Sequence, residues 1–160
     1  MAIYLIYEGI KGNVTADGYK DHIQISSLQF GVGRGVSMEP GNLANREATR
    51  PSISEETITK AADNSVTDFF RESVVGSAGK TAKFKFVQTG TDKVVEYMNI
   101  DLFDCIVSGY SISAPGDGDP QESISISFSK IEVNYNDFDT ANKNSNPQRV
   151  GYDLATAKPI

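Results

Sequence analysis

Cysteine, tryptophan and long apolar runs are scarce or missing in this sequence of 160 residues. The single cysteine, Cys105, cannot form a disulfide within the chain, and its place in the apolar run LFDCIV predicts a buried thiol. No apolar run approaches the length of a membrane span, so we expect no membrane insertion. The first residues, MAIYLIYEGIKG, contain no basic leader, so we expect no signal peptide. Together these features predict a chain that folds in a reducing cytoplasm.

Residues that could build a catalytic or metal site are also few. One histidine, His22, and one cysteine cannot form a His/Cys zinc site within a chain, and no nucleophile motif accompanies His22. The triplet GKT at 79–81 follows a predicted helix and precedes a strand, the reverse of the order in a phosphate-binding loop. An EF-hand loop starting at Asp137 would lack its required Gly and Glu. We therefore predict no catalytic residue, no metal and no cofactor, and a protein that is not an enzyme.

Basic residues are outnumbered, with 15 Lys and Arg against 21 Asp and Glu, which gives a formal net charge of −6. This balance argues against a nucleic-acid partner. The hydrophobic content of 39% and the charged content of 22% are typical of a globular protein. The length fits one domain, which we place at residues 1–160.

The most regular segment, residues 122–129, alternates strictly between apolar residues and serine. A period of two predicts a β-strand with one apolar and one polar face. Serine is a mediocre strand former, so a polar face built only from serine is unusual. After Ser129 the apolar positions shift by one residue to Ile131, Val133 and Tyr135. Either a β-bulge near Ser129–Lys130 restores the same core face, or another element, for instance a second copy of the protein, covers the other face.

Residues 19–33 show the same shift within one predicted long strand, and we expect this strand to pair with residues 122–135. Further strands are predicted at 2–8, 52–60, 82–88, 94–113 and 149–158. A helix is predicted at about 65–75, with Ser65 as N-cap, Gly76 as stop, and Phe69 and Phe70 against the sheet. The fold class is therefore mainly β: a compact β-barrel or two-sheet sandwich with one flanking α-helix.

An extended loop is predicted at about 34–51, where Gly, Pro, Asn and Arg are frequent and no periodicity is found. Loops of this length inside a compact domain are usually functional or disordered. The charges in this loop are of both signs, which suits contact with a protein surface better than contact with phosphate.

The serine face of residues 122–129 has two interpretations. It is either the solvated outer face of an ordinary barrel or a polar, uncharged wall beside a confined space. In the second case, Gln29, Ser125 and Ser127 line that space by strand parity. Sheet edges left open by a short barrel would then pair between copies into a closed ring.

Several segments resemble the haemolysin co-regulated proteins (Hcp), the tube subunits of the bacterial type VI secretion system. These segments are AIYLIYEGIKG, IQISSLQFGVGR, SISEETITKAADNS, VVEYMNIDLFDCIVSGYSIS, ESISISFSKIEVNY and GYDLATAKPI. The resemblance runs nearly end to end and rests on the order and spacing of these segments. One departure lies at the helix start, Ser65-Val66-Thr67, where many relatives carry proline.

The resemblance implies a hexameric ring with a wide channel, rings stacked head to tail into a tube, and sheath, spike and effector proteins as partners. It also implies release from the bacterial cytoplasm without a signal peptide. Carried onto this sequence, the loop at 34–51 stacks rings through Arg46, Glu47 and Arg50, and Gln29, Ser125 and Ser127 line the channel. The alternatives are a tail-tube protein of a contractile phage, which shares the fold, and a monomeric β-sandwich binding module.

Overall fold

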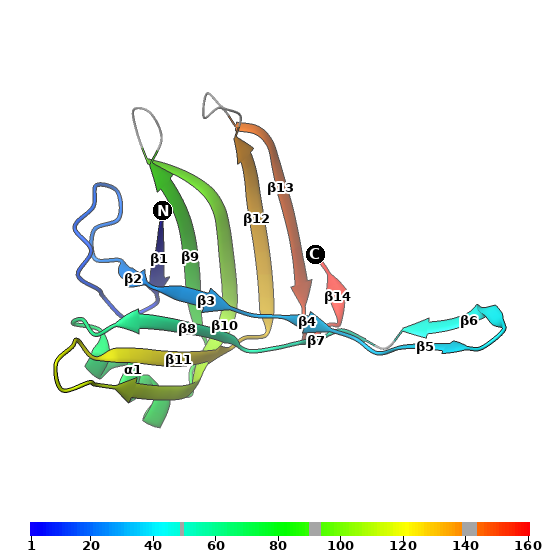
Figure 1. The fold of residues 1–160 in the computed structure, drawn as a ribbon, viewed down its shortest axis with the longest axis horizontal. Helices are drawn as coiled ribbons and strands as arrows, with labels where there is room; N and C mark the ends of the chain where they lie inside the picture. Colours follow the sequence, from blue (N-terminus) through cyan, green and yellow to red (C-terminus); the bar gives the residue numbers. More distant parts are fainter. Residues whose placement is uncertain (49, 90–93, 139–143) are drawn as a thin grey trace.

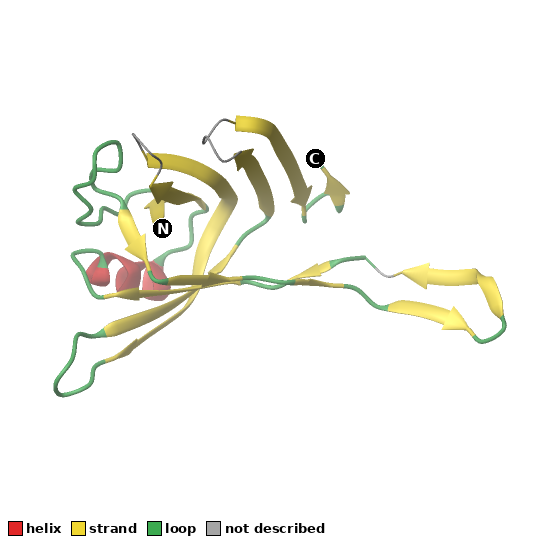
Figure 2. Ribbon diagram, turned by 45° about the horizontal axis from the view of Figure 1, so that its top comes forward, coloured by secondary structure: helices red, strands yellow, loops and turns green. Residues whose placement is uncertain are grey.

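The computed structural model describes the backbone of residues 1–48, 50–89, 94–138 and 144–160. Within these ranges it describes the side chains of all residues except 38–39, 42–48, 89, 137–138 and 144–146. The chain forms an antiparallel β-sandwich of two layers with one helix, α1 (Val66–Val75) (Figures 1 and 2). The predicted fold class is confirmed in its sandwich form, because the sheets do not close into a barrel.

The first layer runs in the order β2 (Ile23–Ile25), β1 (Ala2–Tyr7), β9 (Lys80–Thr89), β10 (Val94–Ser113), β12 (Lys130–Phe138), β13 (Asn144–Asp153) and β14 (Lys158–Pro159). The second layer runs in the order β10, β11 (Gln121–Ser127), β8 (Glu56–Ala61) and β3 (Ser27–Gln29). Strand β10 belongs to both layers. Its first part pairs with β9 and β12, and its residues 106–113 pair with β11. Two register shifts, at Leu102/Cys105 and Val107/Gly109, accompany its bend from one layer into the other.

The parity shift after Ser129 marks the point where the chain changes layers. Strand β11 ends at Ser127 in the second layer, and β12 begins at Lys130 in the first. The Ser129 amide donates to the Phe103 carbonyl over 3.1 Å, so the crossing is held against β10. Phe128 and Ile131 are both buried, so the same core is filled from both sides of the break. The shift is therefore a corner between two strands, and not a bulge within one.

Residues 19–33 do not form one long strand. They contain β2, β3 and the short β4 (Val32–Gly33), and the parity changes at Ser26, between β2 in the first layer and β3 in the second. The predicted pairing of this segment with residues 122–135 is wrong, because β8 lies between β3 and β11. Both segments change parity for the same reason: each passes from one layer to the other.

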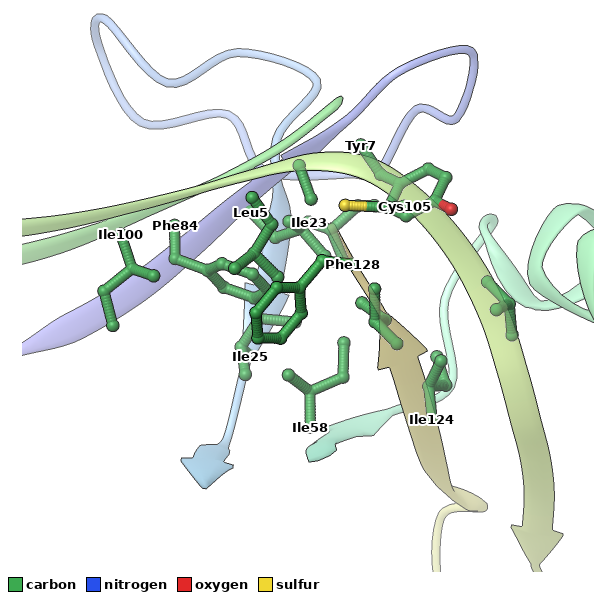
Figure 3. Packing of buried hydrophobic residues seen from close by; sticks show 14 of the residues in the cluster. Leu5, Tyr7, Ile23, Ile25, Ile58, Phe84, Ile100, Cys105, Ile124 and Phe128 are labelled. Carbon is green, nitrogen blue, oxygen red and sulfur yellow. The ribbon is translucent and has the colours of Figure 1, made fainter. Parts of the chain in front are cut away.

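The core fills the space between the layers with aliphatic and aromatic side chains from both (Figure 3). Its fully buried members include Leu5, Ile23, Ile58, Phe84, Leu102, Ile124 and Ile126. The thiol of Cys105 is buried among them, as predicted, and burial raises its pKa to about 12. The alternation of residues 122–129 is also confirmed, since the isoleucines are buried and the serines are half-buried.

Helix α1 follows its prediction in extent but not in every contact. Ser65 is the N-cap residue, yet its hydroxyl donates to the Asp63 carboxylate instead of capping the helix. Phe69 is fully buried, whereas Phe70 is 57% exposed, so only one of the two phenylalanines packs into the core. Gly76 ends the helix with φ of −69°, outside the left-handed region, and its amide donates to the Glu72 carbonyl.

The predicted loop at 34–51 contains a β-hairpin, formed by β5 (Val36–Glu39) and β6 (Asn42–Ala48). Figures 1 and 2 show it as an arm that projects far from the sandwich. The short pair of β4 with β7 (Ser52–Ile53) joins the arm to the second layer. We call residues 34–51 the arm.

Candidate functional site

The outward face of the second layer is the strongest candidate for a functional surface. Antiparallel register places side chains from four strands in rows across this face. Two rows are Ser27–Thr59–Ser123–Ser111 and Gln29–Thr57–Ser125–Gly109. Strand parity adds Ser113 and Ser127 to the same side. We call these ten residues the hydroxyl face.

The hydroxyl face combines small polar side chains with an absence of charge among its ten members. Ser27 and Thr59 form a direct hydroxyl–hydroxyl hydrogen bond across strands. At its β10 side, the Ser108 hydroxyl donates to the Ser125 carbonyl over 3.2 Å. All of its members except Gln29 have a short side chain or none. Such a surface can contact a polypeptide without offering it a deep pocket or a fixed charge.

The predicted channel-lining residues Gln29, Ser125 and Ser127 all lie on the hydroxyl face, where Gln29 is exposed and the two serines are half-buried. Sequence reasoning missed Thr57 and Thr59. These two threonines flank the apolar Ile58, so the same parity argument could have found them.

Charged side chains are found instead on the opposite, core-facing side of the second layer. Lys60 and Glu122 face each other across β8 and β11, both are buried, and they form an ion pair. Lys60 also donates to Asp63 over 3.0 Å, and the Tyr110 hydroxyl donates to Glu122 over 2.6 Å. Through Asp63, which accepts from Ser65, this network ties the start of α1 to the second layer.

Glu56 occupies the same side of β8 but has no ion-pair or hydrogen-bond partner within the described part of the chain. Its side chain is fully buried, and burial raises the pKa of its carboxyl to about 8. The sequence contained a clue to these charges, because Glu122 is in phase with Ile124 and Ile126, and Glu56 and Lys60 are in phase with Ile58.

Both edges of the second layer lack a pairing strand in the described structure. One edge is β3, which pairs only with β8, and the other is the 106–113 part of β10, which pairs only with β11. Open edges of this kind are templates for pairing with another chain. The two edges border the hydroxyl face on either side.

The predicted stacking residues lie on or beside the arm. Arg46 and Glu47 belong to β6, and their side chains are outside the described residues. Arg50 is exposed where the arm meets the body. There it lines an open hollow of about 520 Å³ together with Arg34 and the small residues of β4 and β7.

Catalytic and metal chemistry finds little support in the described residues. They contain no cluster of three His, Cys, Asp or Glu side chains that could hold a metal ion. The Nδ1 of His22 lies 3.1 Å from the Lys20 carbonyl oxygen. Its Nε2 has no hydrogen-bond partner among the described residues, so no nucleophile is paired with this ring. No described helix is both long and apolar enough to cross a membrane.

The family model for the type VI secretion system effector Hcp matches residues 4–135. The chain belongs to the Hcp family. This membership makes it a type VI secretion system protein and bears out the resemblance found in the sequence. A search of curated proteins gave no significant match.

Solved Hcp structures share the fold. A structure described as a type six secretion system protein superposes with a TM-score of 0.92 at 22% identity, covering 99% of both chains. Hcp1 from Salmonella typhimurium gives a TM-score of 0.80 at 22% identity, covering 99% of this chain and 98% of its own. A type VI secretion system effector from Yersinia pestis gives 0.75 at 18% identity, covering 94% and 98%. These proteins therefore share the fold of this chain over nearly its whole length.

Proposed function

We propose that this protein is the structural subunit of the type VI secretion tube, and that six copies close into a ring whose channel is lined by the hydroxyl face. The observation that carries this proposal is the uncharged polar face of the second layer, bordered by two open strand edges. Family membership supports the same assignment.

Ring closure follows from the position of the two edges. When the β3 edge of one copy meets the β10 edge of the next, the hydroxyl faces join into one continuous wall. The contact is heterologous, so each copy uses a different edge toward each neighbour, and a suitable rotation closes the ring. Closure also removes the exposed edges that would otherwise invite aggregation.

Stacking of rings is assigned to the arm. It projects from the body as a hairpin, and Arg46, Glu47 and Arg50 are the residues that we propose as its polar contacts with the next ring. Polar contacts between exposed charges are individually weak. We therefore expect rings to be stable alone, and tubes to need the sheath or the baseplate of the machine as a template.

The channel is proposed to carry and stabilise effector proteins. A wall of serine, threonine and glutamine offers hydrogen bonds at many points without a fixed charge, so it can hold polypeptides of varied sequence loosely. The protein acts by assembly and not as an enzyme. It is proposed to reside in the bacterial cytoplasm before firing and to leave the cell with the tube, without a signal peptide.

Sedimentation of the purified protein tests the ring. The expected result is a species of about six times the subunit mass, seen as rings with a central hole by electron microscopy. Single chains across all concentrations tried would refute the proposal. Arg50→Glu tests the stacking role separately: ring mass should stay unchanged while tube formation with sheath and baseplate components is lost. Normal tubes from that variant would contradict the role of Arg50.

Substitution within the wall tests effector carriage. Ser125→Glu places a charge at the centre of the hydroxyl face, and six charges around one ring should weaken the co-purification of effectors while leaving the ring intact. Thr15→Glu, at an exposed position between β1 and β2 of the first layer and away from the wall, is the matched control. Unchanged effector recovery with Ser125→Glu would show that the wall does not contact the cargo.

A further inference from the structure

An apolar surface lies on the outside of α1. Phe70 and Val74 are 57% and 65% exposed and stand one helical turn apart on the same side. The Phe70 ring packs edge-on against Tyr110 of β10, with centroids 5.9 Å apart, and Ile112, 51% exposed, follows on the same face of that strand. We call these four residues the helix patch. The three most exposed members present on the order of 300 Å² of apolar surface, an extent that often marks an interaction site.

A second apolar surface lies where the first layer extends beyond the second. On the core-facing side of β12 and β13, Val133 pairs with Val150, and Ile131 pairs with Tyr152. Exposure increases outward across this face, from 5% at Ile131 to 62% at Val150. Tyr135, on the same side of β12, is 44% exposed. We call Val133, Tyr135, Val150 and Tyr152 the open face.

The two surfaces lie at opposite edges of the second layer. Helix α1 packs against β10, whose residues 106–113 form one edge. Strands β12 and β13 rise beyond β3, which forms the other edge (Figure 1). Both surfaces are on the side of the layer that faces away from the hydroxyl face, since Tyr110 and Val133 pack against the core.

We infer that the helix patch of one copy packs against the open face of the next copy in the ring. This inference rests on the proposed function, because it specifies the contact that accompanies pairing of the two strand edges. When the β10 edge of one copy pairs with the β3 edge of its neighbour, the helix patch of the first copy lies next to the open face of the second. One heterologous contact then buries both apolar surfaces behind the channel wall.

A second copy fits these surfaces better than a charged partner does. None of the eight residues carries a charge, and aromatic and aliphatic side chains occur in both sets. A stable interface buries about 800 Å² on each partner, with an apolar centre and a polar rim. The helix patch and the open face supply such a centre, and the paired strand edges supply hydrogen bonds at its rim.

Complementary charges at the two surfaces test the contact. Val74→Glu and Val150→Lys each place an unpaired charge in the proposed interface, and each should raise the concentration needed for half-assembly at least about tenfold. The double variant brings the two charges together and should recover most of the loss. Val94→Glu is the matched control, because Val94 is 50% exposed and belongs to neither surface. Since all three valines are largely exposed, thermal unfolding of the isolated subunits should be nearly unchanged.

Disulfide formation gives an independent measurement. The pair Val74→Cys with Val150→Cys should produce covalent oligomers up to the full ring on oxidation, while either single variant should not. The buried Cys105 does not compete in this reaction. If wild-type rings form but the charge variants assemble normally and the cysteine pair does not cross-link, the inference is overturned and the ring proposal stands. If the wild-type protein is monomeric at every concentration, the ring proposal fails, and this contact fails with it.

Discussion

Glu56 makes the stability of this protein sensitive to pH in a range where most carboxylates have no effect. Its carboxyl is fully buried in the second layer without a described hydrogen-bond partner, and burial raises its pKa from 4.5 to about 8. The folded chain therefore keeps a proton on Glu56 that the unfolded chain loses above about pH 4.5. We predict that Glu56→Gln removes much of the resulting pH dependence.

The sign and size follow from linkage. Below about pH 4.5 the carboxyl is neutral in both states and imposes no ionisation penalty. Between pH 4.5 and about 8, the unfolded state is ionised while the folded state stays protonated, so the free energy of unfolding falls as pH rises. Each unit of pKa difference corresponds to about 1.4 kcal/mol, so the total loss by pH 9 is roughly 3 to 6 kcal/mol.

Denaturant unfolding at a series of pH values from 5 to 9, at one fixed protein concentration, measures this loss. The wild-type free energy should fall steadily, and Glu56→Gln should flatten most of the curve. Burial also raises the pKa of Asp101, so that carboxyl adds a loss of the same sign, which begins at lower pH than the loss from Glu56. Glu55→Gln, at the exposed neighbouring position, should follow the wild type. Parallel curves for wild type and Glu56→Gln would refute the reasoning.

Three further predictions concern the buried interior. Lys60→Met leaves the carboxylate of Glu122 buried without its partner and should cost about 3 to 5 kcal/mol in chemical denaturation, while adding Glu122→Leu should restore much of it. Phe69→Ala should cost about 3 to 5 kcal/mol in isolated subunits, whereas Phe70→Ala should cost less than about 1 kcal/mol there, and equal losses would contradict the assigned burial. Cys105 should react with a thiol reagent at the rate of unfolding, because burial keeps it protonated; fast labelling of the folded protein would contradict this.

Local periodicity predicted much of the fold correctly. Strict alternation placed residues 122–129 in a strand with the right residues buried, and helical spacing placed α1 within one residue of its observed start. Parity also placed Gln29, Ser125 and Ser127 on one face, although these residues come from different strands. The strand at 122–129 and helix α1 were predictable because each depends on the pattern within a single segment. The face shared by Gln29 and the two serines also depends on β8, which lies between their strands.

Features that depend on contacts between distant segments were not predictable in the same way. A parity shift is compatible with a bulge or with a corner, and only the partners of the two halves distinguish them. In residues 19–33, β2 pairs with β1 and β3 pairs with β8. In residues 122–135, β11 pairs with β8 and β10, and β12 pairs with β10 and β13. The arm hairpin projects from the sandwich, and its sequence carries no apolar periodicity that could indicate β5 and β6.

The distribution of charge in the second layer is the reverse of that in most exposed sheets. Its outward hydroxyl face has no charged member, whereas its core-facing side carries Glu56, Lys60 and Glu122. A sheet facing bulk water gains solubility from charges on its outer face, and burying three ionisable groups costs free energy. The proposed tube wall has the opposite requirement, because in the proposed ring six copies of any charge would face one another and the cargo across the channel. The charges of this layer are therefore on its back, where the Lys60–Glu122 pair connects through Asp63 to the start of α1 and fixes how the helix is placed against the layer.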